Sequence, residues 1–174
     1  MRAVMNRLRR DWISTLLVAA CVGGCYESDL PLDSQPGAAI NGGLVGTWRC
    51  LPIGGSTGEQ PATVVVKAED KWQYGVTWQE GDKEPERYRA YSSSVRVPRL
   101  LNVEWLKEGK KEGAWAFMRY SLLHPDVLLL QVVDDGALKR VEKSRPALRR
   151  AVERQQKSPS FYVDFAACAR ANNR

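Results

Sequence analysis

The chain has 174 residues, with 26 basic and 20 acidic side chains and a formal net charge of +6. Half of that excess lies in the first 24 residues, where four arginines accompany one aspartate, so the remaining 150 residues carry +3. Such a near-neutral chain does not indicate nucleic-acid binding, and its length fits one domain that can bury a core.

An apolar run over residues 12–25 follows four arginines and precedes a polar stretch. A basic segment, an apolar segment and small residues at its end are typical of an export signal. Ser14, Thr15 and two glycines interrupt the run, whereas a membrane-spanning helix needs about 20 apolar residues. We therefore expect a cleaved signal rather than a permanent transmembrane helix.

The end of this run, Val-Gly-Gly-Cys at residues 22–25, resembles the lipobox of bacterial lipoproteins. The resemblance implies a signal peptide over residues 1–24 and a lipid on Cys25, which becomes the first residue of the mature chain. Tyr26 then occupies the position at which, in bacterial sorting, aspartate favours retention in the inner membrane. The resemblance therefore implies an anchor in the outer membrane with the domain facing the periplasm.

The cysteines distinguish this cleavage site from a second lipobox-like sequence, Val-Ala-Ala-Cys, that ends at Cys21. Cleavage before Cys25 removes Cys21 and leaves Cys50 and Cys168 as a pair. Cleavage before Cys21 would leave Cys25 as a free thiol in an oxidising compartment. We therefore predict lipidation of Cys25 and a structural disulfide between Cys50 and Cys168.

Residues 25–43 contain two prolines and several glycines but few apolar side chains. This composition predicts a flexible tether between the lipid and a single domain over residues 44–174. The alternative is that part of this segment covers an edge of the domain.

From residue 44 to residue 133, short apolar segments are separated by turns. Alternation is clearest at Trp72, Tyr74, Val76 and Trp78, which share one face of a predicted strand. Strands are predicted over residues 45–51, 62–68, 71–79, 87–92, 100–107, 114–123 and 127–133. The connections are too short for helical crossovers, which predicts a mainly β fold, an antiparallel meander that closes into a barrel. A β-sandwich or an open curved sheet is the alternative.

After residue 133, helical spacing replaces the alternation. One helix is predicted to begin at Asp134 or Asp135 and end at Lys143, and a second to cover residues 144–156, before a strand-like segment over residues 161–167. Residues 138–174 carry a net charge of +7, and residues 25–137 carry −4. The basic segment either binds anionic lipid or an acidic envelope partner, or is a solvated helix face.

Gly46 and Trp48 form a Gly-x-Trp motif on the first strand of the meander. With the late helix and a cysteine near each end of the domain, this motif resembles the lipocalin or calycin superfamily over about residues 44–170. The resemblance implies a small lipocalin-like barrel, a Trp48 side chain that closes one end, and a disulfide that ties the C-terminal segment to the barrel.

The chain offers few catalytic side chains. His124, the one histidine, lies in a predicted turn beside Pro125 and Asp126, so a catalytic triad is not indicated. With Cys50 and Cys168 paired, no ligands remain for a zinc site of the usual His and Cys type. We therefore predict no enzymatic activity, no catalytic residues, no metal site and no cofactor.

Aromatic side chains are the candidates for ligand binding. In a calycin-like barrel, Trp48, Trp72, Tyr74, Trp78 and Trp105 are expected to line an apolar cavity, unless they fill the core. The predicted function is that of a lipid-anchored, non-catalytic periplasmic module that binds a small hydrophobic ligand and no nucleic acid. The alternative is a structural or assembly component of the cell envelope that acts through its surface on another envelope protein.

Overall fold

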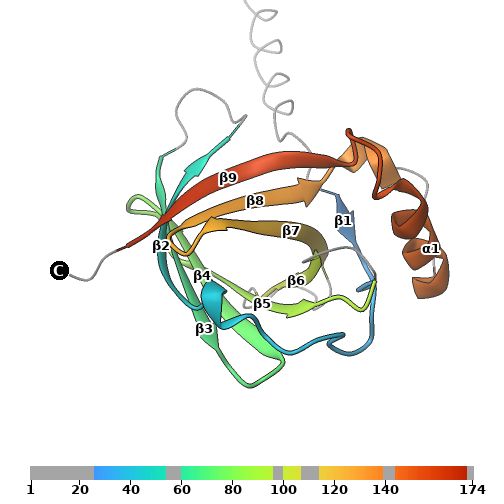
Figure 1. Cartoon of the computed structure of the whole chain (residues 1–174), viewed down its shortest axis with the longest axis horizontal. Helices are drawn as coiled ribbons and strands as arrows, with labels where there is room; N and C mark the ends of the chain where they lie inside the picture. The colour runs from blue at the N-terminus through green and yellow to red at the C-terminus, as the bar shows by residue number, and fades with distance from the viewer. Residues whose placement is uncertain (1–25, 54–59, 96–99, 107–113, 139–143, 172–174) are drawn as a thin grey trace, which may run out of the picture.

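The computed structural model describes residues 26–53, 60–95, 100–106, 114–138 and 144–171. Strands dominate this part of the chain, with one α-helix near its C-terminal end (Figure 1). In chain order the elements are β1 (Glu27–Ser28), η1 (Gly42–Leu44), β2 (Gly46–Pro52), β3 (Ala62–Ala68), β4 (Gln73–Glu80), β5 (Glu86–Ser92), β6 (Leu100–Trp105), β7 (Trp115–His124), β8 (Val127–Val133), η2 (Asp135–Leu138), α1 (Arg145–Gln155) and β9 (Tyr162–Arg170).

Strands β2 to β9 form a closed antiparallel barrel. Each strand from β2 to β8 pairs with the next along the chain, and β9 pairs with both β8 and β2. This last pairing closes the sheet and leaves no exposed edge among the eight strands. The predicted barrel is therefore confirmed over the open curved sheet and the sandwich.

The antiparallel order gives the barrel two distinct ends. Strands β2, β4, β6 and β8 run towards the end that we call the mouth, and the other four run away from it. At the opposite, closed end Leu44, Trp48 and Tyr74 are almost completely buried. The short helix η1 precedes β2 at this closed end.

Trp48 is held in place by contacts on both sides. Its Nε1 donates a hydrogen bond to the Leu44 carbonyl at 2.9 Å. The Arg170 guanidinium lies 4.2 Å from the centre of its ring and donates to the carbonyls of Gly43 and Val45, at 2.8 and 2.9 Å. Because β2 and β9 are the strands that close the barrel, these contacts join its first and last strands.

Position 46, next to the contact between Arg170 and Trp48, requires glycine. Its φ is +141°, and a Cβ atom there would lie 2.5 Å from Arg170 Nη1. We expect Gly46→Ala to lower the free energy of unfolding by about 1 to 3 kcal/mol, because it combines backbone strain with displacement of Arg170. Urea denaturation would measure this. Gly42→Ala is the matched control, since a Cβ there meets nothing within 4 Å, and an equal loss in both variants would contradict the explanation.

Residues 26–41 pack along the outside of the barrel, as in the alternative that part of the tether segment covers the domain, and we call them the strap. The strap begins as β1, which pairs with β7, and Leu32 is buried. The amide of Gly37 then donates to Ser92 O at 2.8 Å, and that of Ile40 to Lys71 O at 3.0 Å. The segment therefore covers the domain over its whole length from the mouth to the closed end.

A buried carboxylate fixes the middle of the strap. Asp33 accepts hydrogen bonds from the side chains of Ser93 and Ser94 and from Arg149 of α1, the last at 3.0 Å. The amide of Leu32 donates to Asn102 Oδ1 at 2.8 Å. Burial raises the pKa of Asp33, but the hydrogen bonds from Ser93, Ser94 and Asn102 outweigh burial and leave this pKa below its usual value.

This lowered pKa predicts a loss of stability in acid. Ionised Asp33 stabilises the fold fully above its unfolded-state pKa near 3.9, and this contribution is lost as the pH falls towards the lower folded-state pKa. We expect Asp33→Asn to cost about 1.5 to 3 kcal/mol at pH 7. Urea denaturation of both proteins at pH 7 and pH 3 should show the difference narrowing in acid, and a gap of constant size would contradict this account.

Helix α1 packs outside the barrel wall. Its buried residues Leu148, Ala151 and Val152 join a cluster with Phe117 and Val133, which point outward from β7 and β8. The second predicted helix thus agrees with α1, while the first is replaced at its start by the 3-10 turn η2, and its end lies outside the described residues. Figure 1 shows α1 next to β1, far from the C-terminus.

The disulfide is confirmed. Cys50 on β2 and Cys168 on β9 are direct cross-strand partners with a Cα–Cα distance of 3.9 Å, and their sulfur atoms are bonded. Both are buried and face the barrel interior. The bond therefore joins the same two strands that close the barrel.

A candidate ligand cavity inside the barrel

The barrel encloses a cavity of about 310 Å³. Alternation along most of the strands turns every second side chain inward, and most of these are aliphatic or aromatic. The non-aromatic apolar part of the lining comprises Leu44, Val64, Val66, Val76, Ala90, Leu101, Val103, Ala114, Ala116, Met118, Leu128, Leu130 and Val132, besides Cys50. The space is thus an apolar interior that the aromatic side chains do not fill.

Four of the five aromatic residues expected at the cavity line it. They are Trp48, Tyr74, Trp78 and Trp105. Trp72 does not: it is 40% exposed and lies before β4, which begins at Gln73. The reason is local, because Asp70 Oδ1 accepts hydrogen bonds from the amides of Trp72 and Gln73, at 2.6 and 2.8 Å, and holds a turn where alternation had suggested strand.

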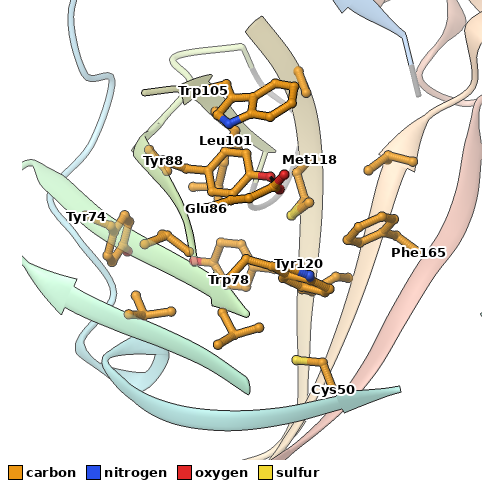
Figure 2. Close-up of a pocket in the computed structure, with 18 of the residues that line it drawn as sticks. Cys50, Tyr74, Trp78, Glu86, Tyr88, Leu101, Trp105, Met118, Tyr120 and Phe165 are labelled. Atoms are coloured by element: carbon orange, nitrogen blue, oxygen red, sulfur yellow. Dashed lines mark hydrogen bonds between the residues drawn. The ribbon is translucent and has the colours of Figure 1, made fainter. Parts of the chain in front are cut away.

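Aromatic rings surround the cavity towards its mouth. The Tyr88 and Trp105 rings stack with centres 6.2 Å apart, and the Trp78 and Phe165 rings lie 5.3 Å apart (Figure 2). Phe165 was not among the predicted residues. The β8–β9 pairing shifts register between Leu130 and Gln131, and this irregularity accompanies the turn of Phe165 into the cavity.

Carboxylates lie among these rings. Tyr88 Oη donates to Glu86 Oε2 at 2.5 Å, and Trp78 Nε1 donates to Glu80 Oε1 at 3.4 Å. The pKa of Glu80 lies below its usual value, chiefly because Lys83 donates a hydrogen bond to it. With Glu27, these two are the charged side chains of the described cavity lining, so the lining's charge is negative at its mouth.

The floor of the cavity at the closed end has two tyrosine hydroxyls. Tyr74 Oη accepts a hydrogen bond from the Asn41 amide at 2.5 Å, and Asn41 Nδ2 donates to Tyr120 Oη at 3.4 Å. Burial raises the pKa of Tyr74, so its hydroxyl stays neutral at physiological pH. The floor is therefore uncharged and closed by the strap.

His124, the one histidine of the chain, is not part of the cavity lining. His124 is exposed at the β7–β8 turn of the closed end, with Nδ1 3.9 Å from Asp126 Oδ2. Within the described ranges, no group of three or more His, Cys, Asp or Glu side chains could hold a metal ion. The arrangement is suited to enclosing an apolar molecule.

The basic C-terminal segment is partly engaged within the molecule. Arg149 pairs with Asp33 and, at 3.1 Å, with Glu153, while Arg170 stacks on Trp48. These contacts account for two of its basic side chains as structural groups. None of the helices in the described ranges is long and apolar enough to cross a membrane.

Fold and site together define a closed eight-stranded antiparallel barrel with an internal apolar cavity, the architecture that the Gly-x-Trp resemblance implies. Comparison of the chain with protein-family models, curated proteins and solved structures found no match.

Proposed function

We propose that this protein is a lipid-anchored, non-catalytic module of the bacterial envelope that binds a small hydrophobic ligand inside its barrel. The observation that carries the proposal is the apolar cavity of about 310 Å³, which lies at the lower end of the usual range for ligand sites. At about 30 Å³ for each water-sized group, the cavity holds roughly ten non-hydrogen atoms. A single alkyl chain of about that length is the ligand class that fits.

The anchor and the location are part of the proposal. The sequence of residues 22–25 supports lipidation of Cys25, and Tyr26 supports the outer membrane with the domain in the periplasm. The Cys50–Cys168 disulfide suits an oxidising compartment. Mass spectrometry of the mature N-terminus should find a lipid-modified Cys25. A chain that begins unmodified, or at Cys21, would contradict this part.

The binding proposal is tested by titrating the protein with primary alcohols of increasing length. Trp78 and Trp105 line the cavity, so tryptophan fluorescence reports its occupation. We expect affinity to rise about fourfold with each methylene, about 0.8 kcal/mol, and to level off near ten carbons, where the cavity is full. A flat response across chain lengths would contradict a ligand cavity.

The acidic lining predicts a preference between head groups. Because Glu27, Glu80 and Glu86 are the charged residues of the described lining, decanoate at pH 7 meets like charge at the mouth. We expect decanol to bind more tightly than decanoate, with the difference decreasing as salt is added. Tighter binding of decanoate would contradict this electrostatic account of the mouth.

A surface role is the second candidate, and one observation favours it. The outer face of β2, β8 and β9 exposes Leu51, Val127 and the small side chains of Ala167 and Ala169. Exposed apolar residues grouped on one face can form a contact with another envelope protein. A surface role and ligand binding in the cavity are compatible. The ligand titration comes first, because it tests the cavity directly.

A further inference from the structure

We infer that the N-terminal anchor holds the mouth of the barrel against the membrane, so that the ligand passes directly between the bilayer and the cavity. The inference rests on the proposed function, since it takes the lipid on Cys25 and the apolar ligand as given. It adds the surface that meets the membrane and the source of the ligand, a single-chain amphiphile resident in the bilayer.

The described chain starts at the mouth. The amide of Tyr26 donates to the carbonyl of Val133, the last residue of β8, at 3.1 Å. Glu27 pairs with Ala116 at the start of β7, and Glu27 itself lines the cavity. A lipid on the residue before Tyr26 is therefore attached at the rim of the ligand cavity.

The start of the strap has little freedom to move away from that rim. Tyr26 is buried, and its ring lies 5.8 Å from that of Phe117. A flexible tether of the predicted length would have had a root-mean-square reach of roughly 24 Å, enough to let either end of the barrel approach the membrane. With the strap packed, the distance from the anchor to the rim is about one residue, or ~3.8 Å.

The closed end is much farther from the anchor. A strand of seven residues such as β2 is about 23 Å long, so the closed end lies several times farther from Tyr26 than the mouth does. Both ends expose some apolar side chains, and at the mouth these include Ile53, Leu106 and Val163. The attachment point, rather than the apolar surface, therefore selects the end that meets the bilayer.

One tryptophan at each end of the barrel allows a direct test. Trp105 lines the cavity at the mouth, and Trp72 is exposed in the turn between β3 and β4 at the closed end. The chain from Cys25 to Arg174 is the mature form that the proposed processing leaves, and with the disulfide formed its free thiol is Cys25. This thiol can be coupled to a maleimide lipid in phosphatidylcholine vesicles.

The measurement is quenching of tryptophan fluorescence by phosphatidylcholine that carries bromine on its acyl chains. We expect the brominated vesicles to quench the anchored protein, Trp105→Phe to reduce that quenching, and Trp72→Phe to leave it unchanged. As a matched control, Cys25→Ser with Arg174→Cys moves the anchor to the other end, because β9 ends at the closed end. With the anchor at residue 174, Trp72→Phe should reduce the quenching and Trp105→Phe should leave it unchanged.

Loss of quenching in Trp72→Phe with the anchor at Cys25, or no quenching by brominated lipid at all, would overturn the inference. Thermal unfolding of each variant verifies that it is folded. The quenching result does not depend on ligand binding, which the alcohol titration measures in solution. It also does not depend on natural lipidation, which mass spectrometry measures. A failure of the orientation is thus distinguishable from a failure of the proposed function.

Discussion

Removal of the Cys50–Cys168 disulfide is expected to lower the free energy of unfolding by up to about 4 to 5 kcal/mol. The two residues are 118 positions apart, so the bond closes a loop that contains almost the whole barrel. The chain-entropy estimate for such a loop is about 4 to 5 kcal/mol, and measured values usually fall below it. The native state adds a further reason, since β2 and β9 are the strands whose pairing closes the barrel.

The comparison is between the oxidised protein and the double variant Cys50→Ala with Cys168→Ala, by urea denaturation. Cys25→Ser serves as the control for loss of a thiol outside the barrel. We expect at least 2 kcal/mol of destabilisation in the double variant and none in the control. Equal stabilities would mean that the strand pairing alone is sufficient to keep the barrel closed.

Filling the cavity is expected to weaken ligand binding at least tenfold. Ala90 on β5 is buried, lines the cavity, and lies between its cross-strand partners Tyr74 and Val103. The Ala90→Phe substitution places a phenyl ring in the space meant for the alkyl chain, and we expect decanol affinity to fall at least tenfold. The new side chain enters existing space, so its cost in stability should stay within the 1 to 3 kcal/mol typical of added core volume.

Ala169→Phe is the control for this variant, because Ala169 on β9 is exposed and points away from the cavity. It should bind decanol as the wild type does. If Ala90→Phe remains folded and binds decanol with unchanged affinity, the ligand lies outside the barrel. If both variants lose binding equally, the surface contributes to it.

The strand pattern and the barrel were predictable from the sequence because they depend on local alternation and short turns. The residues that alternate in β4 from Tyr74 to Trp78 face inward as expected. The disulfide was predictable because, once Cys25 is assigned to the lipid and Cys21 to the signal, Cys50 and Cys168 remain. The strand prediction needs only the pattern of residues that are neighbours in sequence, and the disulfide prediction needs only a count of cysteines.

The strap agrees with the alternative that part of this segment covers the domain, but the sequence could not decide between that alternative and a free tether, because the contacts of the strap are with distant parts of the chain. Leu32 bonds to Asn102, and Asp33 bonds to Ser94 and Arg149, which lie 61 and 116 residues further on. Proline and glycine content indicates a lack of regular structure, which is largely correct here, but regular structure is not needed for packing. Leu32 and Asp33 do not stand out from the other apolar and acidic residues of this segment, so they were too weak a signal.

Two details of the cavity could not be predicted from the alternation of apolar and polar residues. Phe165 turns inward where the register of the β8–β9 pairing shifts, and Trp72 is turned outward by the hydrogen bonds of Asp70. Phe165 is a single-residue departure from strict alternation, whereas Trp72 lies in a turn before β4 begins. A one-residue change moves a side chain to the other face of a sheet, so the alternation rule places such residues wrongly.

The most direct test of the account is to locate a ligand in the molecule. Crystals of the mature chain grown with decanol that carries a terminal bromine would give an anomalous signal at the bromine position. We predict one strong peak inside the barrel, between the Trp78 and Phe165 rings and the Tyr74 floor. An empty interior, or a bromine peak confined to the outer face around Leu51, would contradict it.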